Sequence, residues 1–198
     1  MILKGDFHTH MNGDGIAHRW RNIQNLCYQA MFLGFNSIYL GCHDYVATEF
    51  KEKVEYETGL KVLLGAEITT TAGHILAYNI THIPKDCWAN NVNPVDINKA
   101  LDMIHSQEGK AVIAHPYQLV NGIPKHWCHY DELVKIIDKF DGAEEANYKC
   151  FVKDGTVDFP WVRDYKHLKL FKGSDCHPWS GDTMHKDYFT EIDEEWLK

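Results

Sequence analysis

Short runs of β-branched and other apolar residues alternate with amphipathic segments along most of the chain. Apolar runs bounded by turn residues are typical of strands, and apolar residues that recur with helical spacing are typical of helices. The pattern predicts seven strands, over residues 2–10, 37–44, 61–70, 74–80, 111–117, 142–148 and 168–177. It predicts helices over residues 21–35, 46–58, 95–109, 130–140 and 193–198.

The alternation of strands and helices predicts the α/β class, with a parallel sheet covered by helices. About seven such strands are typical of a barrel or near-barrel. An open, doubly wound sheet is the alternative, although no glycine-rich nucleotide-binding loop follows the first strand. The length of 198 residues suits a single domain over residues 1–198 with a sizeable core.

Histidine and carboxylate side chains occur where the predicted strands end. They are His8, His10, His43, Asp44, Glu67, His115, Asp175 and His177, with His74 at the start of the fourth strand. In a parallel α/β barrel the carboxyl ends of the strands meet around one mouth, so residues far apart in the sequence converge there. Residues two apart in a strand share a face, so His8 and His10 are expected to point inward together.

Several histidines and carboxylates facing one cavity would be costly to bury without partners. Cations are suitable partners, and mixed imidazole and carboxylate donors suit zinc, manganese or iron. A single histidine at a strand end is more often a core or rim residue, but the same residue types at six strand ends favour a shared metal site. Other histidines, including His18 and His105, lie on predicted helices or loops and are not assigned to this site.

The overall composition limits the partners that the protein can have. The formal net charge is −8 and only three arginines occur, which argues against binding to long nucleic acid. An acidic protein can still take an anionic substrate where metals reverse the local charge. No apolar stretch is long enough to span a membrane, and the first residues lack a secretory pattern. Six irregularly spaced cysteines predict reduced thiols and a cytoplasmic location.

The ordered motifs HxH, HD, GxE, H, HP and SDxH resemble the PHP family, which is named for polymerase and histidinol phosphatase. The resemblance covers about residues 5–178. It implies a distorted (β/α)7 TIM-like barrel that holds two or three divalent metal ions, such as Zn, Mn or Fe, and hydrolyses phosphoesters. Two departures occur, because Gly41 and Cys42 replace a Thr-Asp pair and the loop that carries Asp14 is shorter than in the family.

The resemblance also implies a role for individual residues. A first metal would be held by His8, His10, Glu67 and Asp175, a second by Glu67, His74 and His115, and a third by Asp14, His43 and His177. Residues that would support these ligands or line the site are Asp6, Asp44, Glu144 and Asn147. No catalytic side chain is assigned beyond the metal ligands, since a metal-bridging hydroxide would be the nucleophile.

The implied activity is hydrolysis of a phosphomonoester of a small phosphorylated molecule. One alternative is a nuclease or nucleotide phosphatase, in which Tyr117, Trp127 or Trp179 could stack on a base. A second is a non-catalytic, metal-stabilised binding module. A third is C–N bond hydrolysis as in amidohydrolases, where a modified lysine is the typical bridge, whereas Glu67 stands at that position here. The sequence predicts neither the leaving group nor the oligomeric state.

Overall fold

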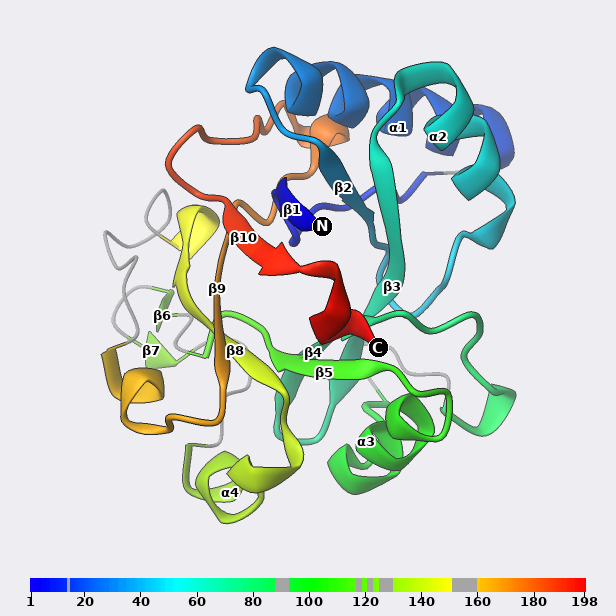
Figure 1. Ribbon diagram of the computed structural model, residues 1–198. Coiled ribbons are helices and arrows are strands. Elements are labelled where there is room, and N and C mark those ends of the chain that lie inside the picture. The colour runs from blue at the N-terminus through cyan, green and yellow to red at the C-terminus, as the bar shows by residue number, and fades with distance from the viewer. Residues whose placement is uncertain (14, 88–92, 117–118, 121–122, 125–129, 151–159) are drawn as a thin grey trace.

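A curled six-stranded sheet forms the centre of the molecule (Figure 1). The computed structural model of the chain describes residues 1–13, 15–87, 93–116, 119–120, 123–124, 130–150 and 160–198. The strand order is β2 (Ser37–Leu40), β3 (Lys61–Thr70), β4 (Gly73–Tyr78), β5 (Lys110–Ile113), β8 (Gly142–Asn147) and β9 (Lys169–Gly173). A short hairpin of β6 (Leu119–Val120) and β7 (Ile123–Pro124) lies outside this sheet.

The direction of β4 corrects the expectation of a parallel sheet. β4 runs antiparallel to both β3 and β5, whereas β2, β5, β8 and β9 each have a parallel neighbour. The physical reason is the connection, because β3 and β4 are joined by a tight turn, and parallel strands need a longer crossover. The α/β class is thus confirmed, while a closed (β/α)7 barrel is not.

The first predicted strand divides into two parts. β1 (Ile2–Gly5) pairs antiparallel with β10 (Thr190–Asp193), a strand that the sequence pattern does not predict. The chain after β1 then passes between the two edges of the six-stranded sheet. The amide of His10 donates to the carbonyl of Cys176 beyond β9, and that of Met11 donates to Gly41 beyond β2, both at 2.9 Å. The HxH segment is therefore held between the ends of the two edge strands.

Helices pack around the sheet (Figure 1). Among them are α1 (Gly15–Phe32), α2 (Lys51–Thr58), α3 (Ile97–His105) and α4 (Tyr130–Lys135). Short 3-10 turns cover Thr48–Phe50, Lys85–Cys87, Ile137–Lys139, Pro160–Asp164, Pro178–Ser180 and Glu194–Leu197. Each predicted helix is present in part, but α1 begins earlier than expected and the predicted helix at the C-terminus is a 3-10 turn. None of the helices in the described part of the chain has the length and apolar character needed to cross a membrane.

The two faces of the sheet bury different kinds of residue. Successive side chains of a strand alternate between the faces. On β3, Ala66 and Ile68 pack toward the core that contains Leu101 of α3, whereas Leu63 belongs to a second core with the aromatic residues of the other face. Alternation puts Glu67 on the same face as Leu63. The site therefore lies at the end of this second, aromatic-rich core.

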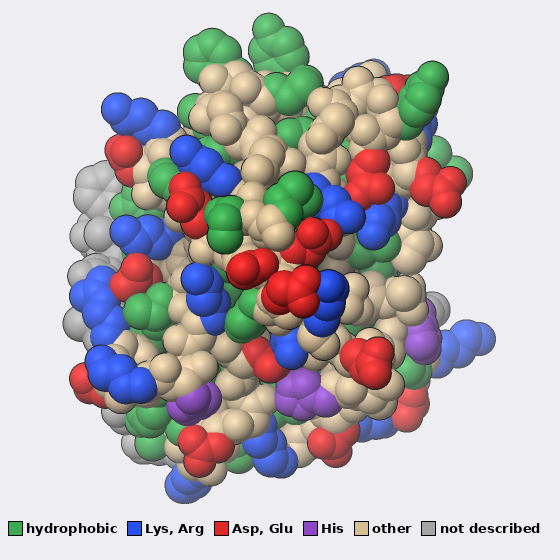
Figure 2. All heavy atoms as spheres, viewed as in Figure 1, with side chains coloured by type: hydrophobic (Ala, Val, Ile, Leu, Met, Phe, Trp, Pro, Cys, Tyr) green, Lys and Arg blue, Asp and Glu red, His purple; other side chains and the backbone are tan. Residues whose placement is uncertain are grey.

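The outer surface carries charges of both signs. Acidic and basic side chains are interspersed over β10 and the C-terminal turn (Figure 2). Lys61 lies 3.3 Å from Glu194 in this region.

The five cysteines in the described residues are free and buried, as the sequence predicts; they are Cys27, Cys42, Cys87, Cys150 and Cys176.

Candidate metal centre

Glu67 is the centre of the polar cluster. Its side chain is buried, with 1% of the residue exposed. Imidazole nitrogens of five histidines from four segments surround its carboxylate. The N–O distances are 2.8 Å for His115, 2.9 Å for His74, 3.0 Å for His43, 3.3 Å for His10 and 3.6 Å for His8. One carboxylate cannot satisfy five imidazoles by itself. The arrangement instead suits a carboxylate that is shared between cations.

Asp175 forms a second anionic point next to Glu67. Its Oδ1 lies 3.1 Å from Nε2 of His10, 3.6 Å from Nε2 of His8 and 3.3 Å from Nδ1 of His177. The structure thus brings together all the described residues that were predicted as ligands, from strands that are distant in the sequence. Asp14, the remaining predicted ligand, lies outside the described residues.

Three sets of donor atoms are close enough to share an ion. The atoms of each set lie within 4.8 Å of one another, and the sets are His8–His10–Asp175, His8–Glu67–His115 and His10–His43–His177. The first corresponds to part of the expected first site. The other two join ligands that were expected to belong to different sites. One groups His8 of the first site with His115 of the second, and the other groups His10 of the first site with His43 and His177 of the third. The convergence agrees with the prediction, whereas the division among individual ions stays a prediction.

Several donor atoms of the cluster are oriented for an ion. Nε2 of His8, Nε2 of His10 and Oδ1 of Asp175 are buried and make no hydrogen bond with any residue that the structure describes. Buried polar atoms are normally hydrogen-bonded, so such atoms facing one another need another partner. Nitrogen and oxygen donors together suit zinc, manganese or iron. These residues therefore fit a divalent metal.

Glu144 orients two of the histidines. Its Oε1 lies 2.9 Å from Nδ1 of His8, and its Oε2 accepts from the amide of His115 at 2.6 Å and from Nδ2 of Asn147 at 3.1 Å. With the proton of a neutral His8 on Nδ1, the Nε2 lone pair faces the cluster. A register shift between Glu144 and Ala146 marks a β-bulge. The bulge brings Asn147 to the side of Glu144, which regular alternation would not allow.

The carboxylates of Asp6 and Asp44 accept hydrogen bonds from backbone amides of neighbouring segments. Asp6 accepts from the amides of His8 and Ser174, both at 3.1 Å, and from the Ser174 hydroxyl, so it ties the first segment to the end of β9. Burial raises the pKa of Asp6 to about 7. Asp44 accepts from the amide and hydroxyl of Thr69, at 3.0 and 3.2 Å. Both residues therefore hydrogen-bond to segments that carry candidate ligands, and their role at a metal site stays a prediction.

Three residues of the candidate site have left-handed backbone conformations. The φ angles are 52° at Asp44, 26° at His115 and 53° at Asp175. Residues other than glycine rarely adopt such angles, and those that do occur preferentially at functional sites. At His115 the angle has a visible effect. Alternation along β5 would point His115 toward α3 with Ile113, but its Nε2 instead lies 2.8 Å from Glu67.

The charges of the cluster are complementary. Burial lowers the pKa of His10 to about 3, so this imidazole is neutral. Burial also opposes protonation of His8, but the charges of Glu144 and Asp175 outweigh it and raise the pKa of His8 well above its ordinary value. For Glu67, burial opposes ionisation, yet the nearby His74 and His43 hold its pKa well below the ordinary value. The carboxylate is therefore ionised, as a metal ligand must be.

Lys149 is a residue of the site that the sequence does not reveal. Its Nζ contacts Nδ1 of His177 and lies 3.0 Å from Oδ2 of Asp182 and 3.5 Å from the carbonyl of Asp175. A lysine shortly after a strand is usually exposed, so its type and position give no signal. Only the fold brings this ammonium group next to a predicted ligand.

Comparison with known proteins adds to this geometry. No protein-family model matches the chain. An uncharacterised protein of Methanocaldococcus jannaschii is 27% identical over 125 residues, which cover 58% of this chain and 68% of that protein. A two-domain protein of Bacteroides vulgatus, described as containing a predicted PHP-like metal-dependent phosphoesterase, matches 92% of this chain with a TM-score of 0.60 and 22% identity. The chain spans about half of that protein, 54% of its length.

Two further solved structures have a similar fold. A Bifidobacterium adolescentis protein whose name proposes a metal-dependent phosphoesterase has a TM-score of 0.62 and 15% identity, with 86% of each chain covered. An amidohydrolase of Chromobacterium violaceum, whose structure contains sulfate and no metal, has a TM-score of 0.59 and 16% identity over 96% of this chain and 91% of that one. The chain therefore has the fold of the PHP-like metal-dependent phosphoesterases, in agreement with the resemblance of its ordered motifs to the PHP family.

Proposed function

We propose that the protein is a hydrolase that uses two or three divalent metal ions to cleave a phosphomonoester of a small molecule. The observation that supports this proposal most strongly is the convergence of five imidazoles on Glu67, beside the buried carboxylate of Asp175. The similarity in fold to proteins named as metal-dependent phosphoesterases supports the reaction class.

The proposed ligands divide among the ions as the motifs imply. His8, His10, Glu67 and Asp175 would hold a first ion, Glu67, His74 and His115 a second, and His43 and His177 a third, together with Asp14. Such ions act as Lewis acids that make water a nucleophile near neutral pH and neutralise charge on phosphate oxygens. In a chain with a net charge of −8, they would also provide the positive field that an anionic substrate requires.

The protein's own residues position this chemistry. Glu144 fixes the ring of His8 and the backbone of His115 through its two oxygens. Asp6 holds the segments that carry His8 and Asp175, because it bonds to His8 and Ser174. Preorganised ligands of this kind need no rearrangement when charge develops on the phosphate.

The alternatives differ from the proposal at identifiable residues. A non-catalytic module is disfavoured because a histidine or carboxylate residue stands at every described position where a metal ligand is expected, and these side chains converge. Hydrolysis of C–N bonds, which the amidohydrolase neighbour raises, is disfavoured because Glu67 and not a lysine lies at the centre. A nuclease that acts on long strands is disfavoured by the three arginines of the sequence.

The experiment combines metal analysis with a phosphate-release panel. Metal content of the purified protein is measured by mass spectrometry, and release is assayed on sugar phosphates, amino-alcohol phosphates and nucleotides. Asp175→Asn should lose metal and phosphate release together. The control is His105→Ala, which removes an exposed histidine of α3 outside the metal centre. The His105 side chain pairs with Asp141 at 3.2 Å. Metal-loaded protein that releases phosphate from no member of the panel would refute the proposal.

A further inference from the structure

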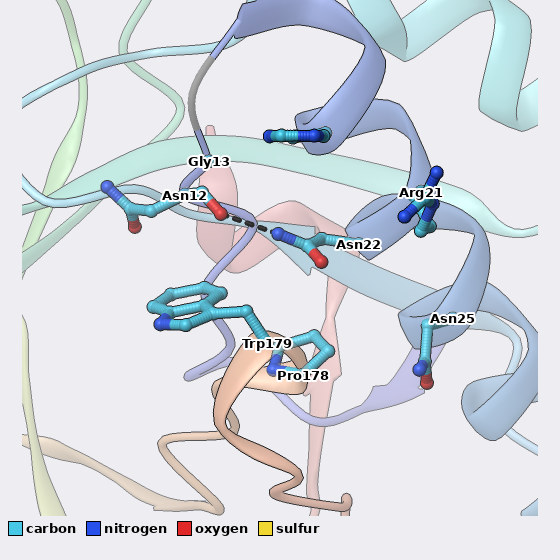
Figure 3. A pocket seen from close by; sticks show the side chains of 8 residues that line it. Asn12, Gly13, Arg21, Asn22, Asn25, Pro178 and Trp179 are labelled. Carbon is cyan, nitrogen blue, oxygen red and sulfur yellow. Dashed lines mark hydrogen bonds between the residues drawn. The ribbon is translucent and has the colours of Figure 1, made fainter.

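A cavity of about 570 Å³ adjoins the metal centre between α1, the loop after β1 and the turn Pro178–Ser180 (Figure 3). Asn12 lies in its wall and its Oδ1 accepts from the amide of His43 at 3.3 Å. On the other side, the Trp179 ring lies 4.8 Å from the His177 ring and is nearly perpendicular to it, at 75°. The cavity therefore lies next to two of the candidate ligands, His43 and His177.

One wall of the cavity is a polar stripe on α1. The residues His18, Arg21 and Asn22 line it. Arg21 and Asn22 follow His18 by three and four residues, so each is a neighbour of His18 on the surface of the helix. The apolar stripe of the same helix is on a different face, where Ile23 and Leu26 are buried. None of the described residues that line the cavity is acidic. This is unusual in a chain with a net charge of −8.

Arg21 differs from the other two arginines of the sequence. Arg19 lies 3.5 Å from Glu49 and Arg163 lies 2.7 Å from Glu145, so both are paired. Arg21 makes no ion pair with any residue in the described part of the chain. Its side chain is exposed and faces the cavity (Figure 3). A guanidinium group matches the geometry of a carboxylate or phosphate with two parallel hydrogen bonds.

The opposite wall is flat and apolar. Trp179 and Pro178 form it, and Trp179 is 48% exposed (Figure 3). An exposed tryptophan beside a polar cluster provides a surface against which a ring or carbon skeleton can pack. A molecule with its phosphate among the candidate ligands could thus lie on Trp179 and extend toward Arg21.

We infer that this cavity binds the alcohol portion of the substrate and that Arg21 pairs with a second anionic group on it, either a carboxylate or a second phosphate. The inference rests on the proposed function for the position of the first phosphate. It narrows the substrate class to phosphomonoesters that carry another negative charge, separated from the scissile phosphate by a skeleton that packs on Trp179.

The experiment compares matched pairs of esters that differ in the second anion. The pairs are glycerol phosphate with phosphoglycerate, glucose phosphate with phosphogluconate, and phenyl phosphate with para-carboxyphenyl phosphate. Wild-type kcat/KM should be higher for the doubly anionic member of at least one pair. Arg21→Met should lower that value by roughly tenfold or more, because a hydrogen bond to a charged group is lost, and should change the other member by less than about twofold. Arg163→Met, which removes an arginine that pairs with Glu145, should leave both unchanged.

A binding measurement separates this inference from the proposed function. Phenylphosphonate and para-carboxyphenylphosphonate, which have no ester bond to hydrolyse, are titrated calorimetrically into wild-type and Arg21→Met protein, and phenylene bisphosphonate tests phosphate against carboxylate. Tighter binding of either doubly anionic compound, lost in Arg21→Met, supports the inference even if no ester is hydrolysed. Equal binding of all three compounds, together with equal kcat/KM within each ester pair, overturns it even if the protein proves to be a phosphoesterase.

Discussion

At the scale of single residues, a substitution of Glu144 tests whether metal affinity depends on the residues that hydrogen-bond to the ligands. Its Oε1 lies 2.9 Å from Nδ1 of His8, so Glu144→Gln replaces a charged acceptor by an amide of the same shape. Loss of such a supporting carboxylate typically weakens metal binding about 10–100-fold, and we expect a change of that size. The measurement is calorimetric titration with zinc or manganese in the presence of a competing chelator.

The neighbouring residue supplies a matched control for this substitution. Glu145 follows Glu144 on β8, but its carboxylate pairs with Arg163 at 2.7 Å on the outer surface. Glu145→Gln changes the charge by the same amount and should bind metal like the wild type. Equal weakening in both variants would show that total charge, and not the orientation of His8, determines the affinity.

Lys149 can compete with a metal ion for His177. Nδ1 of His177 contacts the Lys149 ammonium and lies 2.8 Å from the carbonyl of Asp175. In the tautomer in which Nδ1 accepts from the ammonium, the ring proton resides on Nε2, and that nitrogen cannot act as a ligand. Lys149→Met removes this competitor and should increase the amount of metal bound per chain at a fixed free metal concentration. Lys172→Met, on the exposed side of β9, is the control. Unchanged metal content in Lys149→Met would contradict this reasoning.

At the scale of elements, α3 separates the stability of the fold from the site. Leu101 is fully buried in the core between α3 and the sheet. Leu101→Ala leaves a cavity and should lower the free energy of unfolding by about 2–5 kcal/mol in a urea titration. Asp102→Ala, an exposed position on the same helix, should change it by less than about 0.5 kcal/mol. The folded Leu101→Ala protein should retain the wild-type metal content per chain.

The pattern of apolar residues predicts elements better than it predicts their pairing. β3 and α3 lie where the pattern places them, because their apolar residues face a continuous core. The pattern does not reveal β10, whose four residues gain their partners only from β1 at the other end of the chain. The reversal of β4 and the bulge in β8 also depend on neighbours that periodicity does not record.

At the scale of the whole molecule, the pKa values of the cluster predict how metal binding depends on pH. The carboxylates around them raise the pKa of His8, His43 and His115, although burial opposes this. Each must lose its proton before it can bind a metal, so binding should release protons and the affinity should increase as the pH rises. Calorimetry of metal-free protein in buffers of different ionisation enthalpy measures the released protons. Binding that releases none, with an affinity independent of pH, would contradict the assignment of these ligands.

The candidate site was predictable as a set of residues but not as a geometry. Spacing along the strands identifies His8, His10 and Glu67, since strand ends converge in an α/β fold. The side to which His115 points depends on a left-handed backbone angle of 26°, and the position of Lys149 depends on the chain after β8. The cavity at Arg21 arises from the packing of α1 against the turn at Trp179, which no local pattern indicates.

The central claim is that Glu67 holds two metal ions at once. Anomalous diffraction from crystals of zinc- or manganese-loaded protein tests it most directly. The account predicts two ions that each take an oxygen of Glu67 as ligand, at about 2.0–2.2 Å for zinc, with His8, His10 and Asp175 on one and His74 and His115 on the other. Anomalous peaks that all lie away from Glu67, or a single ion that leaves either group of ligands without metal, would contradict it.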